Sequence, residues 1–153
     1  MADNFDKATA LTLLNQILEA ELAGVVRYTH YSFMVYGYNR IPIVSWLREQ
    51  ASQGLTHAHE AGELITLFGE HPSLKIGPLL ETHQHEIRDI LLESLEAEKR
   101  ALELYYKLLE QVKDKNVMLE EFARKMIYEE ETHVGEVNKM LRKPGEVKAF
   151  SPE

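Results

Sequence analysis

Apolar residues recur every three or four positions over most of this chain, and this spacing is the feature that most limits how it can fold. It puts apolar side chains on one face of an α-helix and predicts four helices, over about residues 7–36, 42–69, 78–112 and 117–141. At 1.5 Å per residue, helices of about 25–35 residues are roughly 40–50 Å long. Such lengths favour an all-α fold, an antiparallel four-helix bundle, over a compact orthogonal packing.

Residues that break or begin helices stand between the four stretches. Gly37 ends the first, Pro42 suits the first turn of the second, and Asn116 is a candidate N-cap for the fourth. The longest connection, GEHPSLKIGP at 69–78, is expected to cross over the bundle so that the second and third helices run parallel. Residues 1–153 are therefore interpreted as one domain, and the last eight residues are expected to be loose.

The composition argues against several classes of protein. Hydrophobic residues make up 44% of the chain and charged residues 27%, as in ordinary globular domains, and no apolar run is long enough to span a membrane. The net charge of −8 argues against binding to nucleic acid, which needs a basic face, whereas an acidic surface attracts cations. The chain has no cysteine, and its first residues lack the features of a signal peptide, so a cytoplasmic location is expected.

Polar side chains that bind metals interrupt the apolar faces of all four helices. Glu21 lies on the first face, His57 on the second and Glu98 on the third, while the fourth carries Glu130 and His133 at a spacing that lets both reach one point. Each residue alone is explained more readily by a solvated or hydrogen-bonded side chain than by a metal. Together they predict a buried site, because carboxylates away from water need compensating charge. A pair of divalent cations supplies it, and these donors suit iron or manganese, with zinc as an alternative.

The segments around these residues resemble bacterioferritin and the wider ferritin-like di-iron carboxylate superfamily over about residues 10–141. The similar segments are ELAGVVRYTHY (21–31), THAHEAGELITLFGEHPSL (56–74), LLESLEAEKRAL (91–102) and MIYEEETHVGEV (126–137). In that family two helices each supply a Glu and the other two each supply a Glu-x-x-His pair. The resemblance implies that Glu21, His57, Glu98, Glu130 and His133 are ligands of two iron ions. It also implies that Tyr28 lies beside the metals as a catalytic residue.

The second helix departs from the family pattern. The resemblance predicts a Glu three residues before His57, but that position is Gly54. Gln53 offers a neutral oxygen nearby, and Glu60 is a substitute in the reverse order. Leu55 stands where bacterioferritins carry the Met that binds haem, so no haem is predicted through this residue.

The end of the chain also differs from bacterioferritin, which has a short fifth helix after the bundle. Only twelve residues follow Leu141 here, and Pro144 and Gly145 interrupt them. That fifth helix surrounds some pores of a 24-subunit shell, so its absence argues against such a shell. The expected assembly is a homo-oligomer, with a dimer or a smaller cage as likely as the full shell.

A second group of His and Glu residues, ETHQHE at 81–86, falls early in the predicted third helix. It is interpreted as a solvated helix face, with a site through which metal ions reach the protein as the alternative.

The resemblance implies an oxidoreductase of the ferroxidase type, which binds Fe(II) and passes electrons to O2 or peroxide for iron storage or detoxification. One alternative is a rubrerythrin-like peroxide reductase, although a chain without cysteine needs electrons from a partner protein. The other alternative is a non-catalytic metal-binding or scaffold protein. The missing glutamate at Gly54 favours it.

Overall fold

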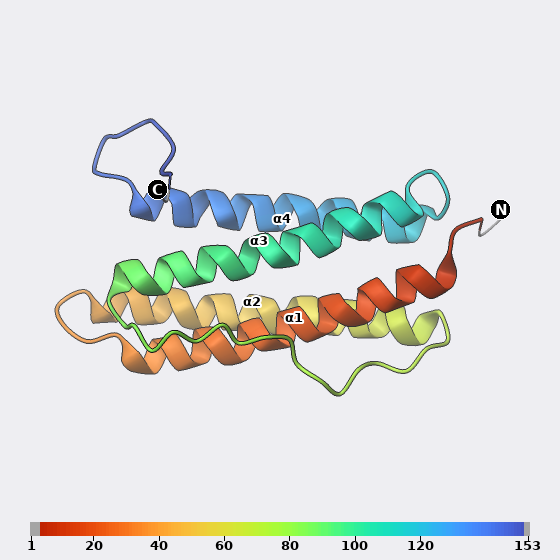
Figure 1. Cartoon of the computed structure of the whole chain (residues 1–153), viewed down its shortest axis with the longest axis horizontal. Helices are drawn as coiled ribbons and strands as arrows, with labels where there is room; N and C mark the ends of the chain where they lie inside the picture. The colour runs from red at the N-terminus through yellow and green to blue at the C-terminus, as the bar shows by residue number, and fades with distance from the viewer. Residues whose placement is uncertain (1–3, 152–153) are drawn as a thin grey trace.

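Four helices account for most of the chain in the computed structural model, which describes residues 4–151. They are Lys7–Met34 (α1), Arg40–Leu67 (α2), Ile87–Val112 (α3) and Val117–Leu141 (α4). The helices lie side by side along one long axis, with a long segment returning beside α1 between α2 and α3 (Figure 1). The predicted all-α bundle with a crossover is confirmed. None of the described helices is both long and apolar enough to cross a membrane.

Side chains at two helix starts explain why the helices begin there. Asp6 accepts a hydrogen bond from the Thr9 backbone N–H at 3.1 Å, and Asn116 accepts one from the Leu119 N–H at 3.0 Å. Each bond satisfies a backbone donor that has no partner within its own helix. The N-cap predicted at Asn116 is thus confirmed.

The third helix begins at Ile87, so its predicted start at Pro78 is wrong. The crossover, residues 68–86, has no helix and follows α1, where the Gly77 N–H donates to the Glu19 carbonyl at 2.9 Å. The length that the connection between α2 and α3 needs explains why the predicted start of the third helix is wrong. A helix of 28 residues such as α2 is about 42 Å long, whereas ten residues span at most about 36 Å. A ten-residue connection is too short to return along the whole bundle.

The helices pack unevenly around the bundle. α1 packs against α2 and α3, and α3 packs against α4, but no Cα atom of α2 lies within 8 Å of one in α4. Polar and aromatic side chains bridge this α2–α4 seam instead. Lys125 Nζ lies 2.9 Å from Glu60 Oε1, and the Trp46 ring stacks on His133 with centroids 5.8 Å apart. The seam is therefore the side from which solvent comes closest to the middle of the bundle.

Buried apolar side chains lie on both sides of that middle. Towards one end they come from the first half of α1 and the second half of α3, and include Leu14, Ile17, Tyr105 and Leu108. Towards the other end they come from opposite halves of the same helices, and include Tyr28, Tyr31, Ile90 and Leu95. Burying each large apolar side chain stabilises the fold by about 1.5–3 kcal/mol. These clusters hold the polar layer between them in place.

The end of the chain folds back onto the bundle, so the prediction that it is loose is wrong for the described residues. Asn138 Nδ2 donates to the Phe150 carbonyl, and the Phe150 N–H donates to Asn138 Oδ1, both at 3.0 Å. The Arg88 guanidinium lies 5.1 Å from the centre of the Phe150 ring. This segment therefore joins α4 to the start of α3. Residues 152–153 lie outside the described part.

Candidate metal centre

Three glutamates from three helices meet in the middle of the bundle. Glu21 of α1 is 7% exposed and Glu130 of α4 is 4% exposed, and the Glu98 side chain of α3 is 12% exposed. The Glu98 and Glu130 carboxylates influence each other electrostatically. A small cavity of about 40 Å³ lies among these side chains. The structure therefore brings together the three carboxylates that interrupt the apolar faces.

His57 of α2 completes one half of the cluster. Its Nδ1 lies 3.5 Å from Glu21 Oε2 and 3.6 Å from Glu130 Oε1, and one donor atom from each of the three residues lies within 4.8 Å of the others. These contacts are too long for good hydrogen bonds. His57 Nδ1 and the other Glu130 oxygen, Oε2, are both buried without a hydrogen-bond partner. Buried polar atoms are nearly always satisfied, so two orphans facing one cavity fit a bound cation.

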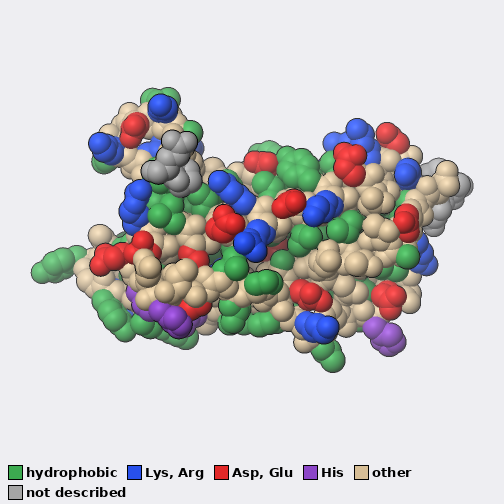
Figure 2. Space-filling view, in the orientation of Figure 1, with side chains coloured by type: hydrophobic (Ala, Val, Ile, Leu, Met, Phe, Trp, Pro, Cys, Tyr) green, Lys and Arg blue, Asp and Glu red, His purple; other side chains and the backbone are tan. Residues whose placement is uncertain are grey.

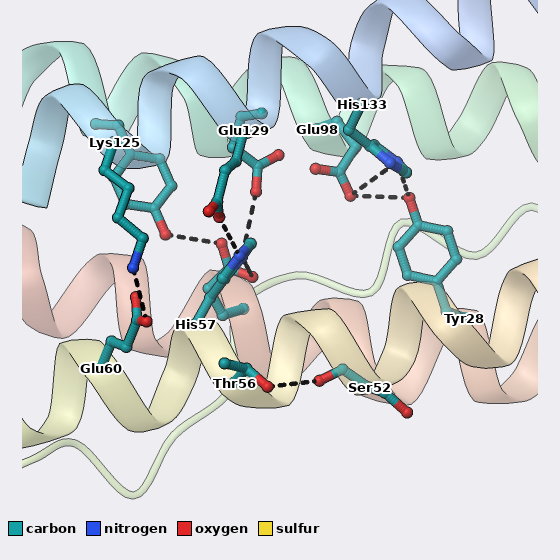
Figure 3. Close-up of polar contacts among 12 residues, drawn as sticks. Tyr28, Ser52, Thr56, His57, Glu60, Glu98, Lys125, Glu129 and His133 are labelled. Atoms are coloured by element: carbon teal, nitrogen blue, oxygen red, sulfur yellow. Dashed lines mark hydrogen bonds and ion pairs between the residues drawn. The ribbon is translucent and has the colours of Figure 1, made fainter.

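Glu98, His133 and Tyr28 form the other half of the cluster (Figure 3). The Tyr28 hydroxyl donates to Glu98 Oε1 at 2.8 Å and lies 3.0 Å from His133 Nε2. It also lies 2.5 Å from the Ser94 hydroxyl. His133 Nε2 is 3.9 Å from Glu98 Oε1, and Trp46 covers the imidazole ring. Tyr28 thus keeps the Glu98 and His133 side chains directed at the same point.

Burial and mutual repulsion change the protonation of these groups. Burial raises the pKa of Glu130 well above its ordinary value, and the Glu98 charge adds to this. Burial likewise raises the pKa of Glu21. Burial acts in the same direction on Glu98, but its interaction with Glu130 and the charge of His133 outweigh it, so the Glu98 pKa is lowered. The two neighbouring carboxyl groups therefore have pKa values shifted in opposite directions, as expected when like charges share a buried site.

The match to known families covers most of the chain. Residues 11–145 match the family model described as a ferritin-like domain. The chain belongs to the ferritin-like family. This membership confirms the resemblance on which the sequence interpretation depends.

Two solved structures share the ferritin-like fold of this chain. A Bacillus anthracis protein described as ferritin-like and diiron-carboxylate has a TM-score of 0.84 and 23% identity, covering 90% of this chain and 98% of that one. A Rhodobacter capsulatus bacterioferritin, described with a metal-free dinuclear site and a haem iron, has a TM-score of 0.79 and 23% identity, covering 92% and 86%. At this identity the likeness concerns the fold alone. No curated protein sequence matches the chain.

Gly54 of α2, where the ferritin-like pattern predicts a glutamate, lies beside the carboxylate cluster. A Cβ atom added at Gly54 would lie 3.7 Å from Glu21 Oε2 and 3.4 Å from Val25 Cγ2. A side chain at position 54 therefore starts beside the cluster, as expected for the absent glutamate. Gln53 lines the same cavity. Glu60 does not join the cluster, because its carboxylate binds Lys125 in the α2–α4 seam.

Two polar partners of the cluster are absent from the sequence prediction. Glu129 Oε2 lies 2.8 Å from His57 Nε2, and the Tyr105 hydroxyl donates to Glu21 Oε1 at 2.8 Å. In each contact, a residue that is not itself a candidate ligand hydrogen-bonds to one that is. Contacts of this kind orient the ligands of metal sites. Burial alone acts to lower the pKa of His57, but Glu21 and Glu129 raise it overall. Sequence spacing gives no signal for Glu129, because its role depends on the separation of α2 from α4.

Proposed function

We propose that this ferritin-like protein binds two iron ions in the middle of its bundle and oxidises Fe(II). The observation that carries the proposal is the pair of buried, unpartnered ligand atoms, Glu130 Oε2 and His57 Nδ1, which face one cavity among three carboxylates. In the proposed site Glu21 and His57 hold one ion, Glu98 and His133 hold the other, and Glu130 lies between them. The diiron-carboxylate and dinuclear-site descriptions of the two structural neighbours support this assignment.

The donor set fits divalent iron in charge and in chemistry. Two divalent ions carry four positive charges, against three from the carboxylates of Glu21, Glu98 and Glu130 when these are ionised. Carboxylate oxygen with imidazole nitrogen suits Fe(II) and Mn(II), and Zn(II) also accepts such ligands. Burial and the charge of Glu98 raise the pKa of Glu130. Bound cations compensate the carboxylate charges, so metal binding is expected to favour the ionised form of Glu130.

Bound iron supplies the electrons that O2 or peroxide accepts. The protein's own side chains position and shield the site. Tyr28 keeps Glu98 and His133 in position through its hydroxyl, and Glu129 orients the His57 ring so that Nδ1 faces inward. The apolar clusters above and below keep bulk water from the polar layer. Small oxidants reach it from the α2–α4 seam, where a cavity of about 470 Å³ includes His57 and His133 in its wall.

Iron storage or detoxification follows from this activity if copies of the chain enclose a space. Large apolar side chains are exposed on α1 and α2, among them Phe33 at 57% and Leu55 at 42%. Exposed apolar patches are typical of surfaces that bind other chains. They support a homo-oligomer, and its mass in solution decides between a dimer and a cage.

A non-catalytic metal-binding role is the second candidate. Gly54 favours it, because the α2 ligand expected there is missing and one ion has fewer anionic donors. On this view the protein binds metal ions without turning over Fe(II).

Stopped-flow oxidation of added Fe(II) tests the proposal, with Glu130→Ala as the disabled variant. Glu131→Ala is the matched control, because Glu131 is the next residue but is exposed and contacts Tyr106. We expect Glu130→Ala to weaken Fe(II) binding at least about tenfold and to abolish fast oxidation, with Glu131→Ala unchanged. If the wild-type protein oxidises Fe(II) no faster than the protein-free control does, only the non-catalytic metal-binding role remains. Equal metal binding by all three proteins would refute the site itself.

A further inference from the structure

A second group of metal-binding side chains lies on the surface, where the crossover passes the C-terminal part of α1. His30 of α1 places its Nε2 2.9 Å from Oε2 of Glu81, which belongs to the crossover. His85 of the crossover lies beside them, with its ring centre 6.0 Å from that of His30. Figure 2 shows histidine side chains gathered at this end of the molecule. His30 thus forms one cluster with two crossover residues that lie at least 51 positions farther along the chain.

The geometry of this cluster suits a single cation. Each of the three residues offers one donor atom, and the three atoms lie within 4.8 Å of one another. Donors bound tetrahedrally to one zinc ion at 2.0–2.1 Å lie about 3.3 Å apart. The difference is within reach of side-chain rotation, because the His30 side chain is 45% exposed.

One donor of the cluster has no partner. His85 Nε2 is shielded from solvent and makes no hydrogen bond. A histidine nitrogen ordinarily forms a hydrogen bond to water or to a neighbouring polar group. The absence of such a partner at His85 Nε2 fits a bound metal ion. Glu81 supplies the negative charge.

We propose that His30, Glu81 and His85 bind a divalent transition-metal ion of the zinc type, at a site separate from the bundle core. Two imidazoles and one carboxylate form a donor set that binds Zn²⁺ and leaves a position for water. The bound ion ties the crossover to α1. The crossover has no helix of its own, so such a tie restrains the segment that connects the two halves of the bundle.

Zn²⁺ binding by the full-length chain tests the proposal. The background is Glu130→Ala, in which metal binding by the core is weakened, and an added change at His30 shows whether the remaining Zn²⁺ ion belongs to the surface site. We expect this protein to retain one Zn²⁺ in equilibrium dialysis, and the added change His30→Ala to weaken its binding at least about tenfold. His83→Ala is the matched control, because His83 is an exposed histidine of the same segment outside the trio. Equal binding by all three proteins overturns the site.

Proteolysis of the crossover gives a second readout that needs no core variant. In otherwise wild-type protein we expect Zn²⁺ to slow cleavage within residues 68–86, and His85→Ala to remove this protection while His83→Ala keeps it. Cleavage that Zn²⁺ leaves unchanged, or slows equally in both variants, overturns the proposal. Because the core ligands are intact in this experiment, its outcome is independent of whether the bundle oxidises iron.

Discussion

Position 54 offers the sharpest test of how the bundle core is built. A Cβ at Gly54 would meet its nearest neighbours at 3.4, 3.5 and 3.7 Å, which is ordinary van der Waals contact. Gly54→Ala therefore fits without displacing the backbone. Alanine in a helix interior is more stable than glycine by about 0.5–1 kcal/mol. For a chain of this size we expect the melting temperature to rise by about 1–4 °C.

Gly54→Glu adds a fourth carboxylate beside Glu21, so its effect depends on metal. Without metal the new group is either ionised near other anions or protonated. Protonating a carboxyl of ordinary pKa near 4.3 at pH 7 costs about 1.36 kcal/mol per pH unit, so the penalty is at most about 4 kcal/mol. Gly54→Gln has the same shape without the charge. We expect metal-free Gly54→Glu to be less stable than Gly54→Gln by an amount within this limit.

In the presence of metal ions, Gly54→Glu should be favoured over Gly54→Gln. A cation compensates the added carboxylate, so Gly54→Glu should bind Mn²⁺ at least about tenfold more tightly than Gly54→Gln. Mn²⁺ is a suitable probe because its binding is measured by calorimetry without the oxidation that Fe(II) undergoes. Fe(II) oxidation by Gly54→Glu should also be faster than in the wild type. Equal Mn²⁺ affinity in the Glu and Gln variants, with equal melting temperatures in the absence of metal, would refute the claim that position 54 faces a metal site.

Three further predictions concern the groups around the core. Glu129→Ala should lower metal affinity by about 10–100-fold through loss of the contact with His57, while Glu136→Ala, at an exposed position seven residues farther along α4, serves as control. Tyr105→Phe should destabilise the metal-free protein by about 1–3 kcal/mol in urea unfolding, because Glu21 Oε1 loses its donor; an unchanged midpoint would show that this bond contributes nothing. The metal-free protein should lose stability as the pH rises above about 5, whereas the metal-bound protein should not, and a flat pH profile without metal would contradict the buried cluster.

The sign of that pH dependence follows from the direction of each pKa shift. Glu21, Glu130 and His57 all have raised pKa values in the folded chain. The folded protein then keeps protons that the unfolded chain releases once the pH exceeds the ordinary pKa values, so rising pH favours unfolding. The lowered pKa of Glu98 acts in the opposite sense, but only below its ordinary value near 4.5. Metal ions should likewise bind more tightly as the pH rises, because they displace these protons.

The spacing of residue types along the sequence predicts the helices of this molecule and its buried polar layer. The period of the apolar residues gives the four helices, and the interruptions at Glu21, Glu98 and Glu130 give the polar layer, because both properties depend on one helix face at a time. The start of α3 at Ile87 was not predicted, since it depends on the distance that the crossover has to span. The roles of Glu129 and His30 were missed for a related reason. Each depends on a contact between segments far apart in the sequence, which spacing does not encode.

Anomalous diffraction from crystals of the metal-loaded protein tests the central claim most directly. Data collected at the iron or manganese absorption edge locate bound ions without assumptions about the ligands. We expect two peaks in the middle of the bundle, with Glu130 oxygen and His57 Nδ1 at coordination distances of about 2.0–2.3 Å from metal. Crystals of loaded protein that show no anomalous peak among Glu21, Glu98 and Glu130 would contradict the proposed centre.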